Sequence, residues 1–196
     1  KIIINMTKDF FRIFILLVFL SSCGGSSTNE PSPNIQIGDY HEGGIVFYVD
    51  ESGQHGLVAS VSNIGSFYWE PTSGGVSSWN NYTNIIGTTT LFGFGESNTN
   101  SIISQLPSTY VQQSAAAKAN QHQFSGFNDW YLPSKEELEL MYYHLNDENT
   151  FSNGEYWTSS QYDINFAWSY LVNLSNTGGN YIPKGASAIV RPIRSF

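Results

Sequence analysis

The residue types best suited to chemistry gather in the last quarter of the 196-residue chain, where aromatic and polar side chains alternate. The set consists of Trp157, Tyr162, Asp163, Asn165, Trp168, Tyr170 and Asn173. Aromatic rings can stack on sugar rings, while carboxylates and amides exchange hydrogen bonds with hydroxyl groups. The pattern predicts a ligand-binding surface, and packing of the same rings in a hydrophobic core is the alternative. The residues expected to contact a ligand are Trp157, Asp163, Asn165, Trp168 and Asn173.

Side chains that could support catalysis or metal binding are scattered along the chain. The four histidines form no His-Glu-x-x-His zinc motif; they are His41, His55, His122 and His144. The oxygen-rich run 146–149 lacks the spacing of an EF-hand calcium loop, so a polar helix end is the favoured interpretation. The run 93–98 lacks the third glycine of a dinucleotide-binding loop and is interpreted as a turn. We therefore expect no catalytic residue, no metal site and no cofactor.

The start of the chain has the order of a bacterial export signal. Basic residues precede an unbroken apolar run at 13–20, which is followed by Ser21, Ser22 and Cys23. The apolar run is too short to span a membrane, because a spanning helix needs roughly 20 apolar residues. Leu20 to Cys23 has the form of a lipobox, so the sequence predicts a lipoprotein signal peptide at 1–22 and lipid attachment at Cys23. The alternative is an ordinary cleaved signal with a chance cysteine.

The rest of the chain is predicted to be a flexible tether at 23–34 and one domain at 35–196. Cys23 is the only cysteine, so an intramolecular disulfide is excluded. Removal of the signal leaves 5 basic and 15 acidic residues, a formal net charge of −10. Such a charge disfavours nucleic acid as a partner. The expected partners are the membrane, through the lipid anchor, and a glycan or protein ligand. The expected location is the cell envelope, at the outer membrane or cell surface.

Hydrophobic periodicity predicts an α+β domain with antiparallel strands and two to three helices. The segment 62–98 has no clear period and is interpreted as long loops. The expected strands are 44–49, 55–61, 156–160, 167–174 and 186–194, and the expected helices are 99–106, 109–121 and 135–145.

The helix at 135–145 has the clearest local signal. Ser134 followed by Glu137 forms a capping-box motif, in which each residue can accept a hydrogen bond from the backbone of the other. An apolar stripe then runs along one side of the helix; its members are Leu138, Met141, Tyr142 and Leu145.

Three groups of motifs follow one another in a recognisable order. They are 43–48 (GGIVFY) with 53–58 (GQHGLV), then 128–138 (NDWYLPSKEEL), then 156–160 (YWTSS) with 167–168 (AW) and 190–194 (VRPIR). Together they resemble the Lcl C-terminal domain family, named for a bacterial collagen-like surface protein, over residues 37–196. The resemblance implies a C-type-lectin-like fold with a role in adhesion or ligand binding. The connection 161–166 is short, however, where lectins carry their calcium and sugar loop.

Three functions follow as hypotheses. The first is a non-catalytic, surface-anchored binding module for a glycan, peptide or protein. The second is a structural or assembly component of the envelope. The third is an enzyme with an unrecognised site, which would need a pocket that gathers histidine and carboxylate side chains with shifted pKa values.

Overall fold

The structure is a computed structural model that describes residues 34–72, 82–146, 150–173, 175 and 177–196. The predicted signal peptide, Cys23 and nearly all of the predicted tether lie outside these residues, as do residues 147–149 of the oxygen-rich run. Within the described part of the chain, no helix combines the length and apolar character that crossing a membrane requires.

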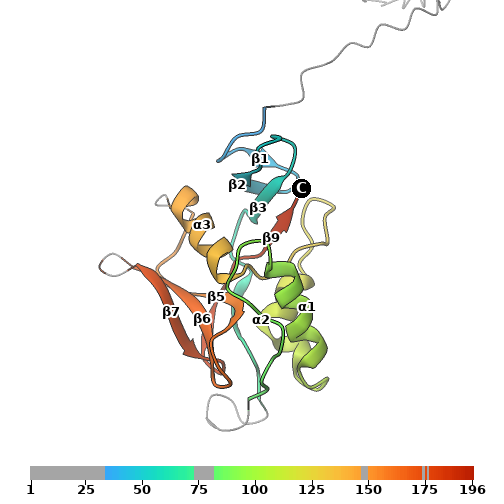
Figure 1. The fold of residues 1–196 in the computed structure, drawn as a ribbon, viewed down its shortest axis with the longest axis vertical. Coiled ribbons are helices and arrows are strands. Elements are labelled where there is room, and N and C mark those ends of the chain that lie inside the picture. The colour runs from blue at the N-terminus through green and yellow to red at the C-terminus, as the bar shows by residue number, and fades with distance from the viewer. Residues whose placement is uncertain (1–33, 73–81, 147–149, 174, 176) are drawn as a thin grey trace, which may run out of the picture. The chain divides into compact units, whose positions relative to one another are not determined.

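Two β-sheets form the framework of the domain (Figure 1). Sheet A has the order β1-β2-β3-β9, and all its pairs are antiparallel. Sheet B has the order β4-β8-β5-β6-β7, in which only the β5–β8 pair is parallel. The strands are β1 (Tyr40–His41), β2 (Gly44–Val49), β3 (Gly56–Ser60), β4 (Gly65–Tyr68), β5 (Gly154–Gln161), β6 (Phe166–Val172), β7 (Gly178–Pro183), β8 (Ser187–Val190) and β9 (Ile193–Ser195).

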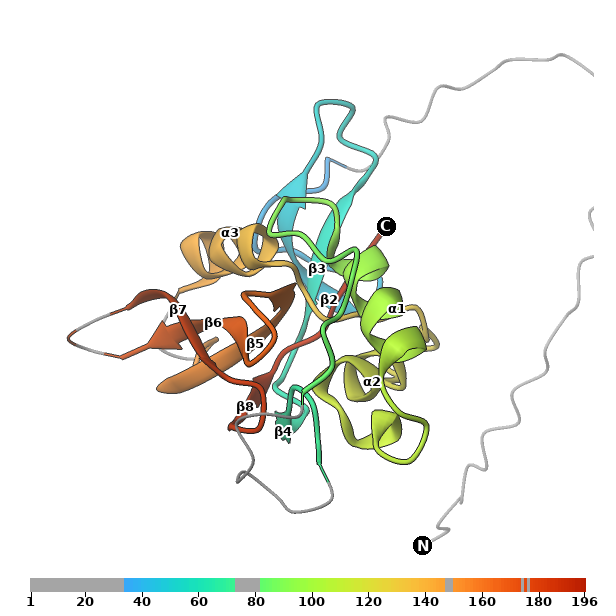
Figure 2. The same ribbon diagram turned by 60° about the horizontal axis from the view of Figure 1, so that its bottom comes forward.

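Helices cover both faces of sheet B. They are α1 (Gly95–Gln105), the short 3-10 helix η1 (Val111–Gln113), α2 (Ala115–Asn120) and α3 (Lys135–Leu145). Trp157 of β5 packs in a core with Ile102 of α1 and the alanines of α2, whereas its neighbour Tyr156 packs in a second core with Met141 of α3. Successive strand residues point to opposite faces, so α1 and α2 bury one face of sheet B and α3 packs on the other (Figure 2).

Most of the expected elements are confirmed, and the differences have local causes. The first helix begins at Gly95, four residues earlier than expected. The second expected helix is divided at Ser114, whose side chain caps α2 by accepting the N–H of Ala117. The last expected strand is interrupted at Arg191 and Pro192, because proline has no N–H for a strand ladder. The α+β class is confirmed.

Two strands of sheet B contradict the sequence interpretation. β4 lies within 62–98, where only loops were expected, and β7 lies between the expected strands 167–174 and 186–194, where no strand was expected. Both have weak local signals and form because a neighbouring strand pairs with them: β4 pairs with β8 and β7 with β6. The edge position of β7 also accommodates Pro183 at its end.

A buried carboxylate joins the starts of α1 and α3. Glu137 is 0% exposed and forms the predicted capping box with Ser134, whose N–H it accepts at 2.7 Å. It also accepts the N–H of Gly93 at 3.1 Å, just before α1. A Cβ at Gly95 would lie 2.2 Å from Glu137 Oε2, so only glycine admits the carboxylate here. Burial raises the pKa of Glu137, and these backbone hydrogen bonds oppose that rise.

The substitution Glu137→Ala tests this junction. Loss of the carboxylate leaves buried amide groups of two helix starts without acceptors, which we expect to lower the free energy of unfolding by about 2–4 kcal/mol. Urea unfolding followed by tryptophan fluorescence measures the change. Glu51→Ala, at an exposed turn, is the matched control and should change stability by less than about 0.5 kcal/mol. Equal effects of the two substitutions would contradict the role assigned to Glu137.

Candidate functional site

Four aromatic side chains from the β5–β6 turn, β6 and β7 form a cluster that we call the aromatic face: Tyr162, Phe166, Trp168 and Tyr181. The rings of Tyr162 and Tyr181 stack in parallel with their centroids 4.1 Å apart. Trp168 meets Tyr162 edge-on at 5.0 Å, and Phe166 meets Tyr181 edge-on at 5.7 Å. Tyr162 and Tyr181 remain 46% and 45% exposed, so the cluster presents rings to solvent.

The strand register explains this cluster. Trp168 of β6 lies opposite Tyr181 of β7, so the two side chains share one face of sheet B. It is also the face on which α3 packs, because Tyr170 follows two residues after Trp168 and contacts Tyr142 of α3. Lys135, at the start of α3, places its Nζ 5.2 Å from the centre of the Trp168 ring. The aromatic face therefore continues into the space beside α3.

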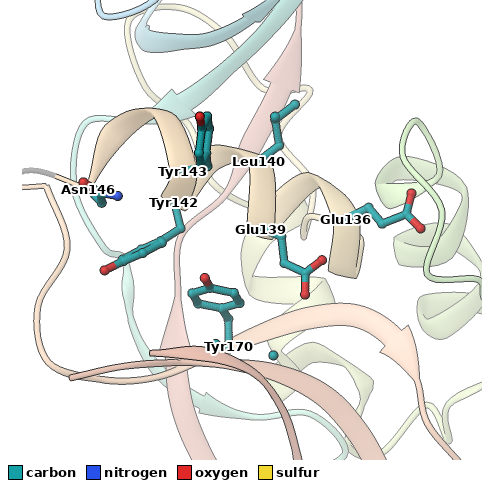
Figure 3. Close-up of a pocket in the computed structure, with 9 residues that line it drawn as sticks. Glu136, Glu139, Leu140, Tyr142, Tyr143, Asn146 and Tyr170 are labelled. Atoms are coloured by element: carbon teal, nitrogen blue, oxygen red, sulfur yellow. The ribbon is translucent and has the colours of Figure 1, made fainter. Parts of the chain in front are cut away.

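That space is a groove of about 580 Å³, which we call the α3 groove. It is open to solvent and lies between α3 and the strands β6 and β7 (Figure 3). Tyrosine and carboxylate side chains dominate its wall. Its lining residues are Glu136, Glu139, Leu140, Tyr142, Tyr143, Asn146, Tyr170, Gly178 and Gly179.

The groove combines aromatic rings with negative charge. The rings of Tyr142 and Tyr170 are 5.1 Å apart, and Tyr143 is 74% exposed. Glu139 accepts a hydrogen bond from Lys135 at 2.6 Å through Oε1. Burial, Tyr142 and the charge of Glu139 all raise the pKa of the Tyr170 hydroxyl, so it stays protonated at neutral pH. The groove can therefore offer ring faces, a phenol and carboxylate oxygens to a ligand.

The structure corrects the assignment of Trp157 to the ligand surface. Its side chain is 1% exposed and lies in the core beneath α1 and α2. Its Nε1 donates a hydrogen bond to the backbone oxygen of Phe67 at 2.8 Å. The core interpretation is therefore the right one for Trp157, whereas Trp168, with the opposite strand parity, belongs to the aromatic face.

The three polar candidates are not gathered at one site. The Asp163 carboxylate accepts the N–H groups of Asn165 and Phe166 and so closes the β5–β6 turn beside Tyr162. Asn173 lies beyond the other end of β6, where its Oδ1 accepts the N–H of Ser175. Asp163 and Asn165 thus border the aromatic face, and Asn173 belongs to a different turn.

Several residues of the site were absent from the sequence prediction. Tyr181 was missed because β7 was not recognised. Glu139 and Tyr143 were missed because α3 was judged only by its apolar stripe; both lie off that stripe. Their spacing along the helix, together with Glu136, was the available signal for a polar and aromatic wall.

A second pocket, of about 340 Å³, contains titratable groups between sheet A and the start of α1. His55, Glu96, Tyr131 and Glu137 are among its lining residues. Burial raises the pKa of Tyr131, so its hydroxyl stays protonated. The Glu137 oxygens accept the backbone N–H groups of Ser134 and Gly93. These contacts give Glu137 a structural role as an acceptor for the backbone at both helix starts.

Other clusters of charge have structural partners as well. The Asp129 carboxylate forms two hydrogen bonds with Arg194, at 2.7 and 2.9 Å, and Trp130 beside it is fully buried. In the part of the chain that the structure describes, no group of three or more His, Cys, Asp or Glu side chains is arranged to hold a metal ion.

A buried lysine holds the chain next to the aromatic face in place through hydrogen bonds. Lys184 directly follows β7, is 0% exposed, and donates to Gln161 Oε1 at 2.8 Å and to the backbone oxygen of Thr83 at 2.6 Å. Glu70 lies 3.7 Å away, and the Trp69 ring centre lies 4.8 Å from Nζ. Burial lowers the pKa of Lys184 to about 8, although Glu70 counteracts the shift.

These features define a class of protein: an α+β domain of two sheets and three α-helices in its described part, with an exposed aromatic and acidic face. The chain belongs to the Lcl C-terminal domain family, whose model matches residues 64–194. β1 to β3 precede the matched segment. The C-type-lectin-like topology that the resemblance implies stays a prediction.

A solved structure shares the fold. It is a fimbrial protein from Bacteroides ovatus, 15% identical, with a TM-score of 0.52. The match covers 81% of this chain and 48% of the fimbrial protein, so this chain spans about half of that protein's length. No curated protein matched the chain.

The Lys184 pKa gives a pH prediction with a defined sign. The unfolded chain holds the lysine proton up to about pH 10.5, whereas the folded chain releases it near pH 8, so the unfolded state binds more protons in between. Stability then rises with pH in this window. Between pH 8 and pH 9.5 we expect the free energy of unfolding of the wild type to rise by roughly 2 kcal/mol more than that of Lys184→Met. Urea unfolding at a series of pH values measures this difference. If the free energy of unfolding changed with pH by the same amount in both proteins, the lowered pKa of Lys184 would be refuted.

Proposed function

We propose that this protein is a lipid-anchored protein of the cell envelope whose domain binds a ligand without catalysis. The observation that carries the proposal is the continuity of the aromatic face with the α3 groove. Exposed rings that lie beside carboxylates in a groove are typical of ligand-binding surfaces. The family, named for a surface protein, and the shared fold of a fimbrial protein support an adhesion-type role. The ligand is a glycan, a peptide or a protein.

The two other hypotheses have less support. In the pocket that Glu137 lines, this buried carboxylate accepts backbone N–H groups, so its contacts support a structural role more than a catalytic one. A structural or assembly role would require a surface that binds another protein. The aromatic face and the α3 groove could also serve as that surface. Deletion of the gene followed by analysis of envelope complexes separates assembly from ligand binding, since loss of a specific complex favours assembly.

Ligand binding should depend on the exposed rings. Screening the mature chain against glycan and peptide arrays identifies a ligand, and titration calorimetry gives its affinity. We expect Tyr181→Ala to weaken binding about fivefold or more, because a stacking contact contributes about 1 kcal/mol. Tyr40→Ala is the matched control, since Tyr40 is 61% exposed on sheet A. A ligand whose affinity is equal in both variants does not use this face and contradicts the proposal.

The anchor can be tested separately. Wild-type protein expressed in a bacterium with lipoprotein processing should partition into the detergent phase of a phase-separation assay, because burial of acyl chains drives membrane attachment. Cys23→Ser should move it to the aqueous phase, and Ser26→Ala in the predicted tether should leave it unchanged. Detergent partitioning of the Cys23→Ser variant would show that lipid at Cys23 is not the anchor.

A further inference from the structure

In the described part of the chain, β7 has one unpaired backbone edge, which lies beside the α3 groove. It is the terminal strand of sheet B and pairs only with β6 among the described strands (Figure 1). An edge strand exposes a row of N–H and C=O groups to which another extended chain can pair. Charged side chains or bulges commonly protect such edges, but β7 begins with Gly178 and Gly179. Its first two residues therefore leave the edge open.

The same two glycines form part of the groove. A Cβ at Gly178 would meet no atom within 4 Å, so the space beside it is open. A Cβ at Gly179 would lie 2.9 Å from Glu139 Oε1, so glycine lets the carboxylate approach the strand. Figure 3 shows Glu139 extending from α3 toward the strand that carries Tyr170. An extended chain paired with β7 would thus have a negatively charged groove within reach of its side chains.

The charge of the groove selects among ligands. Glu136 and Glu139 line it, and Lys135 is already paired with Glu139. Glu136 uses Oε2 to accept the Phe92 N–H at 2.9 Å, which leaves Oε1 outside that contact. Tyr142, Tyr143 and Tyr170 add ring faces, which attract cations. The chain as a whole has a formal net charge of −8. An ammonium or guanidinium group complements this surface, whereas an anionic glycan is repelled.

We propose that the ligand of this face is a basic peptide segment that adds to the edge of β7 as a further strand and places a lysine or arginine side chain in the α3 groove. The inference rests on the proposed function and specifies its ligand. Backbone pairing would supply affinity that depends little on sequence, and the acidic, tyrosine-lined groove would supply selection for positive charge.

The test uses the mature chain and one fluorescent nonapeptide of alternating lysine and threonine, with binding followed by fluorescence anisotropy. We expect saturable binding that weakens as salt rises. Acetylation of the lysines, which removes their positive charge and leaves the peptide backbone intact, should weaken binding about tenfold or more, and so should N-methylation of alternate backbone amides, which blocks strand pairing. The single amine N-acetyl-lysine methylamide should bind at least about tenfold more weakly than the peptide, because it cannot pair along β7.

Variants assign the binding to the groove. Tyr143→Ala and Glu139→Gln should each weaken binding about fivefold, and both positions are exposed enough for the fold to persist. Lys135→Gln should strengthen binding, because it frees the Glu139 carboxylate; a merely structural role of Lys135 would not produce a gain. Tyr40→Ala and Glu51→Gln are the controls. Proton–nitrogen correlation spectra confirm that each variant is folded.

Four outcomes would overturn the inference. Equal binding of the acetylated peptide removes the charge requirement, and equal binding of the N-methylated peptide removes strand pairing. A neutral oligosaccharide that binds with dependence on Tyr143 while the basic peptide does not bind overturns the ligand class but supports the proposed binding function. Failure of the basic peptide, the oligosaccharide and the arrays alike would overturn both.

Discussion

The buried carboxylate of Glu137 is the constraint on which the candidate site depends. Its oxygens accept backbone N–H groups from the segments that start α3 and α1, so it fixes both helix starts to one point. α3 supplies one wall of the groove, and its orientation over β6 follows from this junction and from Met141 in the core below. A carboxylate in an apolar interior is unfavourable unless it is fully hydrogen-bonded. The sequence around it is therefore tightly restricted, down to the glycine at position 95.

Elements with strong local signals could be predicted from the sequence. The capping box at Ser134 and Glu137 defined the start of α3, and alternation of side chains defined β6. The two-sided burial of sheet B could not be predicted, because it depends on which face each neighbouring helix covers. Trp157 and Trp168 look equivalent in the sequence, yet the first is buried beneath α1 and α2 and the second faces α3. Only the register of the paired strands shows that these two side chains point to opposite faces of sheet B.

The parts of the site that escaped prediction are those that tertiary pairing creates. β7 begins with two glycines, which favour turns in isolation, and its strand conformation comes from six paired residues along β6. Tyr181 reaches the aromatic face through that pairing alone. The buried Lys184 then holds the chain directly after β7 to Gln161 and Thr83. These contacts join residues that are far apart in the sequence, so local sequence patterns do not predict them.

The distribution of charge also affects whether the open edge of β7 leads to self-association of the protein. The buried side chains of Glu137 and Lys184 are engaged by hydrogen bonds within the fold, whereas Glu136 and Glu139 line the open groove, with Glu139 next to Gly179 of β7. A second copy of this acidic chain approaching that edge would meet like charge, which opposes self-association through β7. A basic segment would meet opposite charge on the same path. Glu136 and Glu139 can therefore oppose pairing of β7 with a second copy of the chain and also favour the binding of a cationic partner.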